Sequence, residues 1–320
     1  MADVERAPAP LSGGPVLGAL DPSAPSPFGP TSILRRVVAE PVLALLTQRI
    51  LVMDVAHPQV AAGVDDHSRF LTQPWRRAVV TVDAALRLVF GSTETARGAA
   101  RQIYATHDRI HGTVAEPPEP GATAAAYTAH DAALLTWVWA TLVDSAETGY
   151  GRFVAPLSES QAEAFYAEML AFAGFVGIPA DCLPPDRQAF AAYLEAMLAG
   201  GTLGTTTASR ALARHVLFFD HRVVPSPVVR IGRVLALATL DRRLIVALGL
   251  EAEAADERFG RRLDTLLRTV YPHLPRARTG VPRLYVALRR PTIGLATAPR
   301  RLAGTVGARV PGAAPPRRPG

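Results

Sequence analysis

Two histidines, His107 and His111, carry the side chains best suited to chemistry in this chain of 320 residues. They are four residues apart, so on a helix their imidazoles would share one face. An imidazole can bind a metal or a haem iron and can exchange protons near neutral pH. Each histidine also has a structural alternative. His107 could be an ordinary core histidine. His111 is followed by Gly112 and could lie in a last helical turn, where an imidazolium favours the helix dipole.

Arg77 and Thr81 form a second pair with four-residue spacing. They belong to a helix that is expected to begin at Pro74 and to stop at Gly91. The pair could line a cavity, or it could lie on a solvated surface, which is the usual place for an arginine. On a helical wheel the pair lies apart from the apolar stripe of this helix, which comprises Trp75, Val79, Val82, Leu86 and Phe90.

Several common catalytic patterns are absent from the sequence. It contains no glycine-rich phosphate-binding motif, no His-Glu-x-x-His and no Gly-x-Ser-x-Gly. The Glu-x-x-His pairs of di-iron bundles are missing too. The single cysteine, Cys182, excludes an intramolecular disulfide framework and a metal site built from clustered cysteines.

The elements expected to position these residues are helices. Residues 131–145 are apolar on nearly every side, which predicts a helix surrounded by others. A second helix over 92–111 would place the two histidines beside this central helix. Residues 113–126 are expected to form the loop between the two helices. No segment alternates with the period of a strand, so we expect an all-α fold in one domain over 30–285. The remaining helices are expected over 33–53 with a kink at Pro41, 58–67, 74–90, 159–175, 186–199, 206–219, 227–248, 254–269 and, as a final possibility, 280–291.

The net charge of +6 is unevenly distributed. Residues 275–320 contain ten arginines and no Asp or Glu, so the rest of the chain carries about −4. Such a segment could touch nucleic acid or anionic lipid, but no aromatic platform accompanies it, and we expect a solvated, disordered tail over 286–320 and no nucleic-acid partner. Residues 1–29 are rich in Pro, Ala, Gly and Ser and are also expected to be disordered. With no signal peptide and no apolar run of about 18 residues, we expect a cytoplasmic protein without a transmembrane segment.

Several short blocks of residues occur in the order and spacing of one known family. These blocks resemble the DUF2236 family, which includes the bacterial rubber oxygenase (latex clearing protein) and the fungal oxygenase of mycophenolic acid biosynthesis. The resemblance covers about 30–285. The blocks are His57-Pro-Gln-Val-Ala-Ala-Gly-Val-Asp-Asp-His67-Ser68, Arg77-x-x-x-Thr81, Val89-Phe90-Gly91, His107-x-x-Ile110-x-Gly112, Tyr127-x-Ala-x-Asp131-x-x-Leu-Leu-x-Trp137-Val138 and Gly177-Ile-Pro179.

The resemblance implies an all-α, globin-like core that binds haem b. It also implies an oxidoreductase that uses dioxygen to cleave or oxidise an apolar, often isoprenoid, small molecule. His107 resembles the proximal haem ligand of the family, with His111 as the fallback. Arg77 and Thr81 resemble a polar pair near the haem, where Arg77 would orient oxygen or pair with a propionate. The substrate would enter an apolar cavity lined by the helix of 131–145.

The chain departs from the family pattern at one position. Where the family commonly has Trp-Val-His, this sequence has Trp137-Val138-Trp139. If that histidine is a ligand or a base, this chain lacks it. If it acts from further away, the change only reshapes the pocket. This departure motivates an alternative function, a catalytically silent helical protein of the same fold that binds haem or a hydrophobic ligand.

Overall fold

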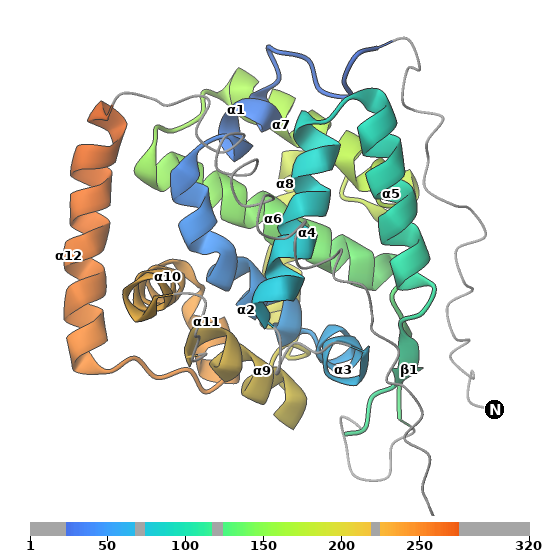
Figure 1. Cartoon of the computed structure of the whole chain (residues 1–320). Coiled ribbons are helices and arrows are strands. Elements are labelled where there is room, and N and C mark those ends of the chain that lie inside the picture. Colours follow the sequence, from blue (N-terminus) through green and yellow to red (C-terminus); the bar gives the residue numbers. More distant parts are fainter. Residues whose placement is uncertain (1–23, 68–73, 117–123, 219–224, 275–320) are drawn as a thin grey trace, which may run out of the picture. The chain divides into compact units, whose positions relative to one another are not determined.

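The expected all-α fold is confirmed in the part of the chain that the structure describes. This computed structural model describes residues 24–67, 74–116, 124–218 and 225–274, without the side chains of 74–79 (Figure 1). The elements are α1 (Ile33–Val38), η2 (Pro41–Leu46), α2 (Thr47–Ala56), α3 (Pro58–His67), α4 (Pro74–Phe90), α5 (Thr93–His107), β1 (His111–Thr113), β2 (Ala126–Thr128), α6 (Ala132–Phe153), α7 (Glu159–Phe175), η3 (Ala180–Cys182), α8 (Arg187–Ala199), α9 (Thr207–Phe218), α10 (Ser226–Thr239), α11 (Arg242–Ala247), α12 (Ala254–Val270) and η4 (Tyr271–His273).

Helix α6 runs through the middle of the bundle (Figure 1). It begins at Asp131, whose carboxylate accepts hydrogen bonds from the first free backbone N–H groups. Its two tryptophans point to different neighbours. Trp137 donates to the carbonyl of Met53 in α2, and Trp139 donates to the carbonyl of Met169 in α7. Both indoles are fully buried, so the expectation of a helix surrounded by others is confirmed.

Two of the expected helices are interrupted. The helix expected over 33–53 with a kink is three pieces, because Pro41 ends α1 and begins the 3-10 helix η2 before α2. The helix expected over 227–248 is divided at Leu240, where the backbone becomes extended. Asp241 then caps α11 by accepting from the N–H of Arg243. Both breaks have local causes, a proline and a capping aspartate.

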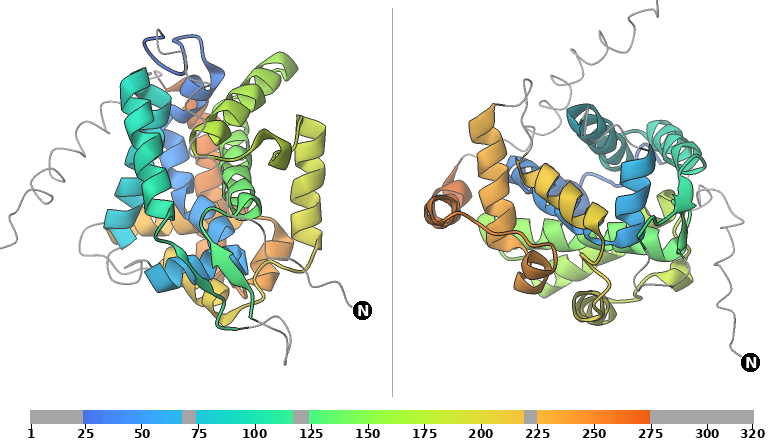
Figure 2. Two further views of the ribbon diagram at one scale, coloured as in Figure 1. Left: turned by 90° about the vertical axis from the view of Figure 1, so that its right-hand side faces the viewer. Right: turned by 90° about the horizontal axis from the view of Figure 1, so that it is seen from below.

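Helices α4 and α5 form an antiparallel hairpin (Figures 1 and 2). Ser92 caps α5, and its hydroxyl accepts from the N–H of Thr95. At the turn, a Cβ on Gly91 would lie 2.3 Å from the carbonyl oxygen of Arg87, so a glycine is required there. Further along the hairpin, Arg87 donates to the side-chain amide oxygen of Gln102 at 2.8 Å.

Residues 24–29 pack against this hairpin. Thr93 donates from its N–H and hydroxyl to the carbonyls of Pro25 and Ala24, and Ser26 donates to the carbonyl of Gly91. Phe28 is buried in the core. Ordered packing therefore reaches into the segment 1–29 that was expected to be disordered. Residues 1–23, the helix considered over 280–291 and the tail 286–320 lie outside the described residues.

The segment after α5 is a small hairpin, which the sequence did not predict. The antiparallel pairs are His111 with Thr128, Gly112 with Tyr127 and Thr113 with Ala126. The helix expected to run to His111 ends at His107 instead.

Candidate functional site

His107 lies where the end of α5 meets the start of α6. It is the last residue of α5 and is half-buried. Its ring lies edge-on to the ring of His130, with the centroids 5.9 Å apart. His130 directly precedes Asp131, the residue that caps α6. The structure therefore places two imidazoles together at the junction of these helices.

A hydrogen bond fixes the second imidazole. Nε2 of His130 donates to Oδ1 of Asp108 at 2.7 Å, and Asp108 caps the C-terminus of α5. The ring of His130 also lies near the ring of Tyr104, with the centroids 4.3 Å apart. Neither His130 nor Asp108 has a role that the sequence predicts. The only signal was the run His130-Asp131 before an apolar helix, and it does not reveal a contact across 22 residues of chain.

The hairpin of α4 and α5 brings Arg77 to the level of His107. Arg77 lies 13 residues before Phe90 at the end of α4, and His107 lies 14 residues after Thr93 at the start of α5. With a rise of 1.5 Å per residue, both are about 20 Å from the turn that joins the two helices. The two expected site residues thus share one end of the hairpin, although the Arg77 side chain lies outside the described part.

The same end of α4 has an uncovered apolar surface. Thr81 is exposed, as are Val80 and Val82, and Val82 has 42% of its surface accessible. Leu86, one turn further along the apolar stripe, is buried at 7%. The stripe is therefore covered near the turn and uncovered near Thr81 among the described residues. Apolar surface of this kind can mark a place where another group binds.

His111 does not lie in a last helical turn, so the alternative of a helix-end role for it is wrong. It opens β1, and its side chain is exposed. Its carbonyl accepts a hydrogen bond from Nε2 of His67 at 2.8 Å, and the two rings lie 6.2 Å apart. The structure thus separates the environments of the two candidate ligands. His107 is half-buried beside His130, whereas His111 is on the strand surface.

Gly112 is not a helix-ending glycine either. Its strand neighbour Tyr127 is buried, and the Tyr127 hydroxyl donates to Asp66 at 2.5 Å. Burial, with the hydrogen bond to Asp66 as a second cause, raises the pKa of Tyr127. A Cβ on Gly112 would lie 2.7 Å from this hydroxyl oxygen, and one on Gly63 would lie 3.4 Å from the ring. The two glycines make room for the tyrosine ring.

Replacing Gly112 with alanine is expected to lower the free energy of unfolding by about 1–3 kcal/mol, because the new methyl group overpacks the Tyr127 ring. Urea unfolding followed by circular dichroism measures the change. Gly98, in the middle of α5, is the matched control, since a Cβ there meets nothing within 4 Å. Gly98→Ala is expected to stabilise the chain by about 0.5–1 kcal/mol. Equal effects of the two changes would contradict the packing of Tyr127.

His57 is a half-buried histidine with a different environment. It caps the C-terminus of α2 directly before Pro58, the first residue of α3. Its Nδ1 is buried and makes no hydrogen bond with the described residues. Burial lowers the pKa of His57 to about 4, and the negative charge of Asp131 offsets part of this effect. His57 is therefore neutral near pH 7.

This environment predicts a loss of stability in acid. Between pH 6.5 and about 4 the unfolded chain binds a proton at His57, and the folded chain does not. Stability attributable to His57 is therefore complete above pH 6.5 and falls as the pH decreases, by up to about 3 kcal/mol. Urea unfolding of the unmodified chain and of His57→Gln across this range measures the difference. His273→Gln, at an exposed histidine, should leave the slope unchanged. A parallel slope in His57→Gln would show that His57 does not cause the loss.

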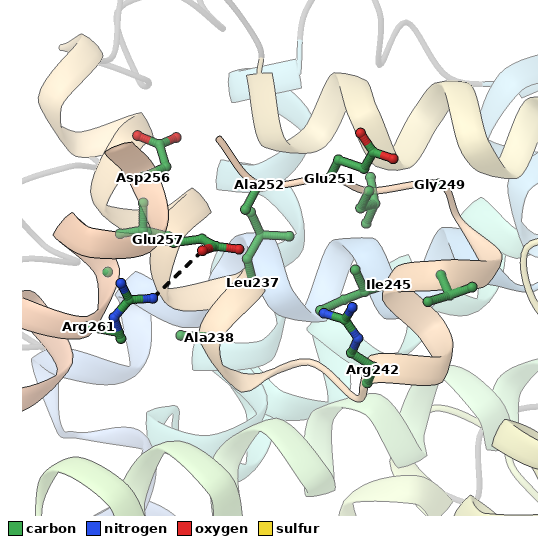
Figure 3. A pocket seen from close by; sticks show the side chains of 14 residues that line it. Leu237, Ala238, Arg242, Ile245, Gly249, Glu251, Ala252, Asp256, Glu257 and Arg261 are labelled. Carbon is green, nitrogen blue, oxygen red and sulfur yellow. Dashed lines mark ion pairs between the residues drawn. The ribbon is translucent and has the colours of Figure 1, made fainter. Parts of the chain in front are cut away.

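Two pockets lie elsewhere on the described surface. One of about 600 Å³ lies between α10, α11 and α12, with Arg242 on one side and the ion pair of Glu257 and Arg261 on the other (Figure 3). A second of about 180 Å³ lies beside α3, β1 and the start of α9. Neither is lined by His107, Arg77 or Thr81.

The donor set favours one kind of iron site over another. Among the described residues, no group of three or more His, Cys, Asp or Glu side chains could hold a metal ion. A bare metal site needs such a group, whereas a haem needs only one or two protein ligands because the macrocycle supplies the others. A single half-buried imidazole, such as that of His107, is therefore a donor of the kind that a haem needs.

A family model described as "ER-bound oxygenase mpaB/B'/Rubber oxygenase, catalytic domain" matches residues 34–269. The chain belongs to this family. The matched range includes His107, Arg77, Thr81 and all of α6. The mpaB/rubber oxygenase family is one of oxygenase catalytic domains, which confirms the resemblance expected from the sequence.

Two curated relatives are similar to part of this chain. They are the uncharacterized protein Mb2261 of Mycobacterium bovis and the uncharacterized protein Rv2237 of Mycobacterium tuberculosis, each 30% identical over 165 residues. The match spans 49% of this chain and 60% of each relative. The comparison with solved structures gave no match. Within the described residues, no helix has the length and apolar character needed to span a membrane.

Trp139, where this sequence departs from the family pattern, occupies a core position. Its ring packs against the rings of Tyr166 and Phe190, with centroid distances of 5.9 and 5.7 Å. The single N–H of the indole ring donates to the carbonyl of Met169. Tryptophan cannot accept or exchange a proton as histidine does. Trp139 therefore packs α6 against α7 and α8 and supplies no acid or base.

Proposed function

We propose that the chain is a haem-dependent oxygenase that acts with dioxygen on an apolar small molecule, with His107 as the axial ligand. The observation that carries the proposal is the position of His107. It is the half-buried imidazole at the end of α5 that lies level with Arg77 on α4. Membership of an oxygenase family supports the reaction class.

The chain's own residues have distinct roles in this proposal. A bound haem would supply the iron at which dioxygen is activated. His107 would hold the haem, and Arg77 would orient oxygen or neutralise a propionate. The uncovered apolar surface near Thr81 and Val82 would lie against the macrocycle or the substrate. The hydrogen bond between His130 and Asp108 would fix the ring that lies edge-on to His107.

A haem titration tests the proposal directly. Haemin is added to the purified chain, and the visible spectrum and a pyridine haemochrome assay report the stoichiometry. One haem per chain with a Soret band typical of histidine ligation is expected. A chain that leaves haemin in its free form would overturn the proposal. Oxygen uptake with apolar alkenes or terpenoids then tests turnover.

The core position of Trp139 favours a second candidate, a catalytically silent protein that binds haem or another hydrophobic ligand. If a base at this point of α6 is needed for the reaction, Trp139 cannot act as that base, because its single N–H is already donated. Stoichiometric haem binding without any oxygen-dependent product would identify this function. Oxygen-dependent conversion of an apolar substrate would exclude it.

A further inference from the structure

Helix α12 presents one face outward at the edge of the described fold (Figure 1). Its inner face packs on α10. Its two ends are fixed, since Asp256 binds Arg230 and Arg233, and the hydroxyl of Tyr271 donates to Glu40. The orientation of the helix about its axis is therefore set by several specific contacts.

In this orientation the acidic and basic side chains of α12 lie on different sides of the helix or are paired with each other. The acidic residues Asp256 and Asp264 are buried and bind arginines of other elements, with Arg152 donating to Asp264 at 2.5 Å. The third acid, Glu257, pairs with Arg261 at 3.7 Å. Arg258 and Arg262 are exposed on the outer face. The negative charges thus lie inward or are neutralised, and the outer face is positive.

The same outer face carries exposed apolar side chains. Every fourth residue lies on nearly the same side of a helix, so a row runs from Arg258 through Arg262 to Leu266 and Val270. Leu274, four residues further and just beyond η4, extends it. The accessible fractions of the three apolar residues are 56%, 43% and 50% in chain order. The row is therefore basic in its first half and apolar in its second half.

The sequence that follows this row is also basic. Residues 275–320 begin directly after Leu274 and contain ten arginines and no acidic residue. Exposed leucine and valine beside arginine suit the boundary between anionic headgroups and acyl chains, where the apolar groups insert and the guanidinium groups stay among the phosphates.

We infer that the outer face of α12, which presents this basic and apolar row, binds the surface of an anionic lipid bilayer. This attachment is peripheral and independent of haem binding. It would hold the protein at the membrane, where apolar molecules concentrate. Neutral lipid gives the apolar contacts without the charge attraction, so the surface selects anionic membranes.

Vesicle flotation of the full-length protein tests the inference. The vesicles are phosphatidylcholine with phosphatidylglycerol, or phosphatidylcholine alone, at low and high salt. We expect binding to the anionic vesicles that weakens with salt. Leu266→Glu should reduce the partition coefficient about tenfold or more, and Arg262→Gln should reduce it about fivefold. The matched controls, Val246→Glu on α11 and Arg214→Gln on α9, change exposed residues with the same change in charge. They should reduce it less than about threefold.

Thermal unfolding of each variant, compared with the unmodified chain, checks that folding is intact, as expected for exposed positions. Equal binding to neutral vesicles, or equal effects of Leu266→Glu and Val246→Glu, would overturn the inference. A lack of binding to the anionic vesicles would overturn it as well. In that case a dimer that Leu266→Glu dissociates, or salt-dependent binding of duplex DNA, would identify a different occupant of this face.

Discussion

His107→Ala is expected to abolish stoichiometric haem binding, whereas His111→Ala is expected to leave it close to that of the unmodified chain. The reason is the different surroundings of the two imidazoles. His107 is half-buried beside His130 at the level of Arg77, and His111 lies exposed on β1 with its carbonyl bound by His67. A haemin titration followed at the Soret band measures both affinities. Loss of an axial ligand is expected to weaken binding by about a hundredfold or more.

Two further measurements separate ligation from a general loss of structure. Thermal unfolding of the haem-free variants shows whether His107→Ala still folds. Added imidazole should restore the Soret band of His107→Ala, because the free ligand can occupy the space that the side chain leaves. A normal Soret band in His107→Ala together with its loss in His111→Ala would exchange the two assignments. Normal binding in both variants would remove the histidine pair from the site.

Asp144→Ala is expected to lower the free energy of unfolding by about 3–5 kcal/mol, since it leaves a buried guanidinium without its countercharge. Arg49 on α2 has only 5% of its side chain accessible, and Nη2 lies 2.6 Å from Oδ2 of Asp144 on α6. Arg49 also donates to Ser145 on α6 and to the carbonyl of Thr239 on α10. This one side chain therefore connects three helices of the core.

Urea unfolding of a small set of variants tests this assignment. Arg49→Met should lower the free energy of unfolding by about 2–3 kcal/mol, which is less than the loss expected for Asp144→Ala. The carboxylate of Asp144 that is left behind is 25% accessible and can be hydrated. Glu257→Gln removes a surface pair of comparable type and should cost less than about 1 kcal/mol. If Asp144→Ala lowered the free energy of unfolding by as little as Glu257→Gln, the ion pair with Asp144 would not be what stabilises the buried Arg49.

Local signals in the sequence predicted much of the helical framework. Helices begin at Pro58 and Pro74, as expected, and the helices expected from 92 and 159 begin directly after the capping residues Ser92 and Ser158. The apolar character of 131–145 predicted the central helix, which continues to Phe153. These features depend on backbone geometry and capping within a few residues, and such information is present in any short window of sequence.

The errors arose where distant residues decide the structure. Gly112 resembled a helix end, but its role is set by Tyr127 across the hairpin of β1 and β2. The same limit applies to the site. His107 was identified from the family resemblance, whereas its neighbour His130 is placed by the meeting of α5 and α6. Nothing in the local pattern around His130 indicates that contact.

Helices α4 and α5 both extend from the turn at Gly91, so the position of a residue along the hairpin depends on its number of residues from that turn. Arg77 and His107 are at the same height only because the two arms contain nearly equal numbers of residues. Inserting one residue into either arm would displace one member of the pair by about 1.5 Å along the axis and turn it by about 100°. In the proposed haem site, the length of the segment 77–107 therefore sets the relative position of Arg77 and His107. Relatives that keep both residues are expected to keep the distance in sequence between them, even where the intervening residues differ.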